Sequence, residues 1–234
     1  MPKKIVVATT KPWNFQNFKK WKSPTGFEKE LISSKDDLTF QNLSQINPCY
    51  VFFPHWSWKI PSDVYENFEC IVFHMTDLPF GRGGSPLQNL ISRGIYQTKI
   101  SALRVIEKMD AGPIYLKEPF DVFTGSAQEL YWRASEIVFE MMTEILISNP
   151  TPEQQSGDVV EFKRRMPTES EIPESCFGRS LYDFIRMLDV EGYPRAFITR
   201  GGKKIEFCGA RLNMDGSVNA TAKMFVEEKE EENG

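Results

Sequence analysis

Two histidines, His55 and His74, are the residues of this 234-residue chain whose ordinary pKa lies closest to neutral pH. A general acid–base enzyme usually needs such a group, so the search for a catalyst starts with them. His74 stands in FHMTDLPFGRGGSPLQ (residues 73–88), and Asp110 lies in the turn MDAGP between two runs of extended character. A carboxylate near an imidazole could orient it and help move protons. A lone histidine is more often structural and a lone turn aspartate more often forms the turn, so the pair is a hypothesis here.

The elements that must position these residues follow an α/β pattern. Short apolar runs at residues 4–9, 50–53 and 70–73 predict buried strands, and residues 36–46 have helical spacing. We therefore predict an α/β fold with a Rossmann-like, mostly parallel sheet. His74 would then lie at the carboxyl end of a strand, where ligands bind in open α/β sheets.

The remainder of the chain predicts one main domain and a smaller one. Further predicted elements are a helix at 85–93, extended runs at 97–106 and 114–122, a helix at 126–148, a helix at 181–188, and strands at 196–199 and 204–208 around a turn at 200–202. Residues 149–157 (NPTPEQQSG) have the composition of a linker. We predict a catalytic domain at 1–150, a small C-terminal α+β subdomain at 158–226, and a disordered acidic tail at 227–234.

Composition excludes several classes of function. Lys and Arg number 28 against 32 Asp and Glu, and the formal charge of −4 argues against a nucleic-acid partner. The four cysteines are widely spaced, with no CxxC pair, so we predict no metal site and a reducing compartment. No apolar run approaches the roughly 18 residues of a membrane span, so we predict a cytoplasmic protein with no membrane partner.

Two motifs carry a resemblance to a known family. Residues 73–88 resemble the HxSLLPxxRGxxPxQ segment of the folate-dependent formyltransferases, with these residues in register: His74, Leu78, Pro79, Arg82, Gly83, Pro86 and Gln88. MDAGPI (109–114) is similar to that family's DxGxI segment, and Asp110 follows His74 at the family's separation of 36 residues. The likeness covers nearly the whole chain, least in the first fifty residues and the tail. It is closest to the nucleotide-sugar N-formyltransferases of pseudaminic acid biosynthesis and to a related formylation domain of a peptide synthetase.

The resemblance implies the formyltransferase fold and transfer of a formyl group from the co-substrate 10-formyltetrahydrofolate to a primary amine. It implies a nucleotide-linked amino sugar as acceptor, expected to be a UDP-linked 4-amino-4,6-dideoxy sugar. Three alternatives remain open: a 10-formyltetrahydrofolate hydrolase, a non-catalytic folate- or nucleotide-binding module, and a tailoring domain that formylates an aminoacyl group on a carrier. A methionyl-tRNA formyltransferase fits less well, because the chain lacks room for a sizeable extra RNA-binding domain and has no net basic charge. A homodimer is a family-based expectation.

The resemblance also implies roles for particular residues. His74 and Asp110 would be catalytic. The family usually has an asparagine that stabilises the oxyanion two positions before the histidine, and this chain has Val72 there. Thr76 or a backbone N–H would then replace that asparagine. The other implied residues are Trp56, Trp58, Ile60, Met109 and Asp110 for the folate, and Met75, Arg82, Gly83 and Tyr193, with Arg195 beside it, for the acceptor. Ordinary core packing explains the two tryptophans equally well, a salt bridge explains Arg82 nearly as well, and a turn explains Tyr193. His55 is assigned no catalytic role.

Overall fold

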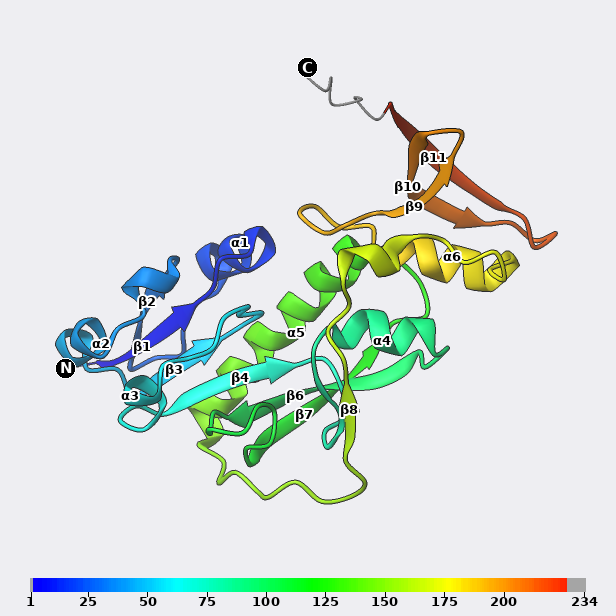
Figure 1. Ribbon diagram of the computed structural model, residues 1–234. Coiled ribbons are helices and arrows are strands. Elements are labelled where there is room, and N and C mark those ends of the chain that lie inside the picture. Colours follow the sequence, from blue (N-terminus) through cyan, green and yellow to red (C-terminus); the bar gives the residue numbers. More distant parts are fainter. Residues whose placement is uncertain (1, 227–234) are drawn as a thin grey trace, which may run out of the picture. The chain divides into compact units, whose positions relative to one another are not determined.

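The computed structural model describes residues 2–226, which form two compact units (Figure 1). Within that range, the first unit comprises residues 2–86, 97–121 and 131–163, and the second comprises residues 87–96, 122–130 and 164–226. The units are therefore built from interleaved segments rather than divided once near residue 150. The predicted acidic tail lies outside the described residues.

The first unit is built on a six-stranded sheet with the order β2-β1-β3-β4-β6-β7. Its strands are β1 (Lys3–Ala8), β2 (Phe27–Ile32), β3 (Tyr50–Phe53), β4 (Cys70–His74), β6 (Gln97–Arg104) and β7 (Ile114–Asp121). The strands from β2 to β4 are parallel, whereas β6 runs antiparallel to β4, and β7 runs antiparallel to β6. The predicted α/β class with a mostly parallel sheet is confirmed.

Helices and loops bury both faces of this sheet, which explains why its strands are continuous apolar runs. Successive residues of β1, from Ile5 to Ala8, are all fully buried although their side chains alternate between faces. One core cluster joins Val6 of β1 to Leu43 of α2 (Phe40–Ile46) and Val64 of α3 (Ser62–Tyr65). Two further helices, α1 (Pro12–Lys20) and the long α5 (Ala127–Ser148), are joined by a hydrogen bond from Asn17 Nδ2 to Ser135 Oγ at 2.8 Å.

Strands β2, β5 (Phe80–Gly83) and β8 (Val160–Phe162) of the first unit were not predicted. The edge strand β2 (FEKELI) carries three charged residues in six and is mostly half-buried or exposed, so it lacks the apolar run of its neighbours. A small parallel pair joins β5 to β8, and β5 falls in a glycine-rich segment for which no strand was predicted. A Cβ on Gly83 would lie 2.4 Å from the carbonyl oxygen of Phe162, so only glycine permits this pairing.

The second unit combines two helices with a three-stranded antiparallel sheet of order β11-β10-β9. Its main elements are α4 (Pro86–Ser92, of which Pro86 belongs to the first unit), α6 (Gly178–Arg186), β9 (Ala196–Arg200), β10 (Lys203–Leu212) and β11 (Val218–Val226). Two short 3₁₀ turns complete the described chain, Lys35–Asp37 in the first unit and Pro167–Ser170 in the second. The predicted β9–β10 hairpin is present, whereas β11 was not predicted. Across residues 2–226, no helix has both the length and the apolar character that crossing a bilayer requires.

Candidate active site

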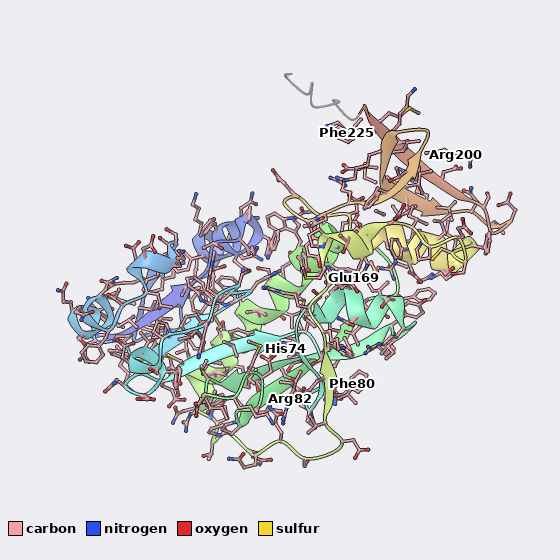
Figure 2. The ribbon with its side chains drawn as sticks, viewed as in Figure 1. His74, Phe80, Arg82, Glu169, Arg200 and Phe225 are labelled. Atoms are coloured by element: carbon pink, nitrogen blue, oxygen red, sulfur yellow. The ribbon has the colours of Figure 1, made fainter. Side chains whose placement is uncertain are left out.

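His74 is the last residue of β4, and strand β6 fixes the chain that follows it. Ser101 pairs with His74 across the two strands, and its hydroxyl donates to the carbonyl oxygen of Thr76 at 2.7 Å. The same hydroxyl accepts from the backbone N–H of Leu78 at 3.4 Å. Figure 2 labels His74 on the ribbon of β4. The exposed fraction of His74 is only 8%. The residue predicted as catalyst is therefore held at the carboxyl end of a sheet strand with little freedom to move.

The hydrogen bonds of His74 define the state of its imidazole ring. Nε2 lies 2.7 Å from the carbonyl oxygen of Gly81, and a carbonyl only accepts, so Nε2 carries a proton. In the neutral ring Nδ1 then holds a lone pair, and it faces Asp110 Oδ2 at 3.6 Å. That distance is too long for a hydrogen bond. Nδ1 is thus the nitrogen positioned to take a proton, and the Asp110 carboxylate is placed to stabilise the cation that results.

Asp110 occupies a constrained turn between β6 and β7. Its φ of +52° lies in the left-handed region, which is costly for a residue with a side chain. Its Oδ2 accepts a hydrogen bond from the backbone N–H of Gly83 at 2.9 Å. Nearby, a Cβ on Gly112 would lie 1.8 Å from the carbonyl oxygen of Arg104, so this turn requires glycine there. The structure therefore brings together the histidine and aspartate that the two motifs contributed.

Thr76 and Val72 bear on how an oxyanion would be stabilised. The side chain of Thr76 is fully buried, and its hydroxyl donates to the carbonyl oxygen of Gly81 at 3.3 Å. Because His74 binds the same carbonyl, this contact supports the position of the imidazole. A catalytic role for Thr76 stays a prediction. Val72 lies two residues before His74 on β4 and packs against the hydrophobic core cluster.

The aromatic loop after β3 (residues 54–61) contains Trp56, Trp58 and Ile60, which were predicted to line a folate site. The rings of Trp56 and Trp58 lie edge to face with centroids 5.1 Å apart, and Trp58 is 43% exposed, whereas Ile60 is buried. The indole Nε1 of Trp56 is buried, and no acceptor lies within hydrogen-bonding distance among the described residues. An indole N–H only donates, so this loop could accommodate a ligand that presents an acceptor.

His55 begins this loop and has a different environment from His74. Its ring packs edge to face on Tyr131 at 4.6 Å and lies 5.3 Å from the ring of Trp13. Desolvation, aided by the charge of Lys11, lowers the pKa of His55 to about 3. The ring is therefore neutral at pH 7.

Arg82 and a residue that the sequence did not single out, Gln155, connect to the Asp110 turn. Arg82 Nε and Nη2 donate to Gln155 Oε1 at 3.0 and 2.6 Å. Gln155 Nε2 donates to the carbonyl oxygens of Asp110 and Gly112, both at 2.8 Å. Gln155 lies within the segment predicted as a linker, and no signal in that polar segment distinguished it from its neighbours.

The other predicted residues occupy varied positions. Met75 is half-buried beside His74, and Met109 is 68% exposed beside Asp110. Tyr193 and Arg195 belong to the second unit, where the guanidinium of Arg195 forms an ion pair with Asp189. The roles predicted for these residues in binding folate or acceptor stay predictions.

Comparisons with known proteins identify the family. A solved structure described as methionyl-tRNA formyltransferase from Clostridium thermocellum is 48% identical to this chain, with a TM-score of 0.92, and the match covers 96% of this chain and 99% of that one. The chain belongs to the formyltransferase family. A family model described as methionyl-tRNA formyltransferase, C-terminal domain, also matches residues 167–225. The predicted enzyme class is confirmed.

Two further similar proteins share less of their sequence with this formyltransferase. A methionyl-tRNA formyltransferase of Rickettsia felis is 27% identical over 140 residues, which are 58% of this chain and 46% of that protein. The chain spans less than two thirds of the length of such curated relatives. The structure of HypX from Aquifex aeolicus in complex with tetrahydrofolic acid is 17% identical with a TM-score of 0.70, covers 88% of this chain and 37% of that one, and so shares the fold.

These comparisons contradict the predicted acceptor. The relatives from Clostridium thermocellum, which is 48% identical, and Rickettsia felis are described as methionyl-tRNA formyltransferases, so the prediction of a nucleotide-linked amino sugar of pseudaminic acid biosynthesis is wrong, and so is the exclusion of nucleic acid. The motifs around His74 and Asp110 indicate the chemistry of formyl transfer. Because that chemistry is the same for different acceptor amines, the motifs do not distinguish one acceptor from another. The charge argument failed because a net charge averages over the chain. Residues 227–232 hold five glutamates and one lysine and so account for the whole formal charge of −4.

Proposed function

We propose that this formyltransferase moves the formyl group of 10-formyltetrahydrofolate to the α-amino group of methionyl-tRNA. The observation that carries the proposal is the 48% identity, over nearly the full length of both chains, to the protein described as the methionyl-tRNA formyltransferase of Clostridium thermocellum. The largely buried pair of His74 and Asp110 supports the chemistry independently. It supplies a base and a counter-charge at the carboxyl end of strand β4, and this end of the strands is where ligands bind in open α/β sheets.

The reaction forms a bond between the amine nitrogen and the formyl carbon and breaks the bond between that carbon and the folate nitrogen. As the amine attacks, it must lose a proton, and Nδ1 of His74 holds the lone pair that can accept it. Asp110 Oδ2, 3.6 Å away, then faces the imidazolium and stabilises its charge. The same proton can pass on to the departing folate nitrogen, which leaves His74 neutral for the next turnover.

We assign the binding site of the 10-formyltetrahydrofolate pterin to the aromatic loop after β3. A pterin is flat and carries ring nitrogens and a carbonyl oxygen, which match the partly exposed ring of Trp58 and the buried N–H of Trp56, for which the described residues offer no acceptor. Burial of that N–H without an acceptor would cost about 1–3 kcal/mol, so a ligand acceptor there would contribute to binding.

The charge distribution of the second unit is compatible with an RNA acceptor. From Arg195 to Val226, the strands β9, β10 and β11 and the turns around them carry six Lys and Arg residues and only two acidic residues. A local excess of cations over acidic residues in the sequence favours contacts with phosphate backbones, whatever the net charge of the chain.

The test is a formylation assay with the full chain, 10-formyltetrahydrofolate and methionyl-tRNA. We expect formyl-methionyl-tRNA and tetrahydrofolate in equal amounts, with uncharged tRNA and free methionine as controls that stay unmodified. Release of tetrahydrofolate without a formylated product would contradict the proposal and indicate a hydrolase. No turnover, with folate still bound in equilibrium dialysis, would also contradict it and indicate a binding module.

A further inference from the structure

The amide of Gln155 joins two parts of the site that are far apart in the sequence. Its oxygen accepts from two nitrogens of Arg82, at 3.0 and 2.6 Å, and its nitrogen donates to the carbonyl oxygens of Asp110 and Gly112 at 2.8 Å each. A carboxamide has two donor N–H groups and one oxygen that can accept twice, so all four hydrogen bonds of the side chain are made.

Only one orientation of this amide satisfies its neighbours. If the amide were rotated by 180°, its NH₂ would face the guanidinium of Arg82, and its oxygen would face the two carbonyls. Donors would then oppose donors and acceptors would oppose acceptors. Arg82 therefore determines which end of Gln155 reaches the Asp110 turn.

The Asp110 turn needs such support from outside. Asp110 has a φ of +52°, in the left-handed region that few residues with a side chain adopt, and such a conformation persists where its surroundings hold it. Gly83 holds the carboxylate of Asp110 through its N–H at 2.9 Å, and Gln155 holds the backbone of the same residue. The direction in which the carboxylate faces Nδ1 of His74 depends on both contacts.

We infer that Gln155 is a positioning residue for catalysis, which holds the Asp110 carboxylate at its distance from His74 through the backbone of the turn. This role rests on the proposed formyl transfer for its kinetic consequence, whereas the hydrogen-bond geometry stands apart from the identity of the acceptor. A shift of about 1 Å in a catalytic group can lower a rate about 100-fold.

The chain offers a matched pair of variants for the test. Gln155→Glu keeps an oxygen for Arg82 but removes both donors to the turn, while Gln154→Glu makes the same change at the neighbouring exposed residue. We expect Gln155→Glu to lower kcat by about 10- to 100-fold, whereas the KM for 10-formyltetrahydrofolate should change by less than about threefold. Gln154→Glu should keep wild-type kinetics. Gln155→Met, which is uncharged and similar in length, should show the same loss of kcat if Gln155→Glu does not fold.

A second measurement does not depend on turnover. The amide proton of Gly83 is held by Asp110 Oδ2, so its hydrogen exchange, followed by NMR, should accelerate at least tenfold in Gln155→Met and stay unchanged in Gln154→Glu. Unchanged exchange, an unchanged kcat, or an equal loss in Gln154→Glu would each overturn the inference. If the wild-type chain does not formylate methionyl-tRNA, the proposed function fails, and the exchange of Gly83 still decides the role of Gln155.

Discussion

Each unit of the molecule contains a buried pair of a basic side chain and an aspartate, and the two pairs are built in opposite ways. In the second unit, Arg186 Nε donates to Asp183 Oδ1 at 2.6 Å, and its other nitrogens donate to the carbonyls of Val122 and Gly125. In the first unit, His74 Nδ1 and Asp110 Oδ2 remain 3.6 Å apart, although both residues are largely buried.

The difference lies in how many hydrogen-bonding positions are already used. The second oxygen of Asp183 accepts from the Tyr96 hydroxyl at 2.6 Å and from Arg179 Nε at 2.9 Å, so this pair is saturated by its neighbours. His74 instead has one ring nitrogen engaged, and the lone pair of the other accepts no hydrogen bond from residues 2–226. A saturated pair stabilises the fold, whereas a pair with an open position can exchange a proton with a substrate.

The largest effect should come from removing the open pair. We expect His74→Ala and Asp110→Ala each to lower the rate of formyl transfer by about 10²- to 10⁴-fold, because each removes a participant in proton transfer. The free energy of unfolding should fall by only about 1–3 kcal/mol, because each side chain makes one hydrogen bond to a backbone group, the His74 ring to Gly81 and the Asp110 carboxylate to Gly83. Single-turnover formylation and a melting curve measure the two quantities. Wild-type turnover in His74→Ala would show that another residue is the base.

The saturated pair should respond in the reverse manner. Arg186→Met leaves Asp183 buried without its main counter-charge, so we expect the free energy of unfolding to fall by about 3–5 kcal/mol. Arg179→Met is the control at the same carboxylate. Arg179 is 31% exposed in its side chain, against 1% for Arg186, so its loss should cost only about 1–2 kcal/mol.

Urea unfolding measures both variants of the saturated pair, and kcat of the folded fraction should stay within about twofold of wild type. Equal losses of stability in the two variants would mean that burial does not set the strength of the pair. A large loss of kcat in folded Arg186→Met would contradict the distinction between a pair that stabilises the fold and a pair that takes part in proton transfer.

His55 provides the smallest effect and a third case, a histidine that has no carboxylate partner within the described part of the chain. Its folded pKa of about 3 lies below the ordinary value of 6.5, so between these values the unfolded chain binds a proton that the folded chain does not. Stability should therefore decrease as the pH falls below 6.5, by up to about 1.4 kcal/mol per pH unit and about 2 kcal/mol by pH 5.

The matched variant is His55→Asn, because asparagine tolerates the φ of +51° at this position. Urea unfolding at pH 7.5 and pH 5 should show that the variant loses less stability than wild type across this interval. Groups other than His55 titrate in both proteins, so the difference isolates this ring. Parallel losses in the two proteins would contradict a neutral, desolvated His55.

Much of the sheet could be predicted from sequence because its central strands are buried on both faces. The runs that became β1, β3 and β4 are apolar whichever way each side chain points. Strand β2 could not be found in this way, since an edge strand with charged residues resembles a loop. The pairing of β5 with β8 also escaped prediction, because it depends on a close approach of Gly83 to Phe162, which lies far along the chain.

The sequence by itself determined which side chains could do the chemistry: a histidine at the end of a buried strand, an aspartate 36 residues later, and the glycines that their turns require. Only the tertiary structure decided which nitrogen of His74 is open, because the Gly81 carbonyl that binds Nε2 lies across a folded loop. The tertiary structure likewise brought Gln155 to Arg82 and Asp110. Hydrogen bonds between segments distant in sequence leave no periodicity or composition by which they could be read, because their geometry exists only once the chain has folded.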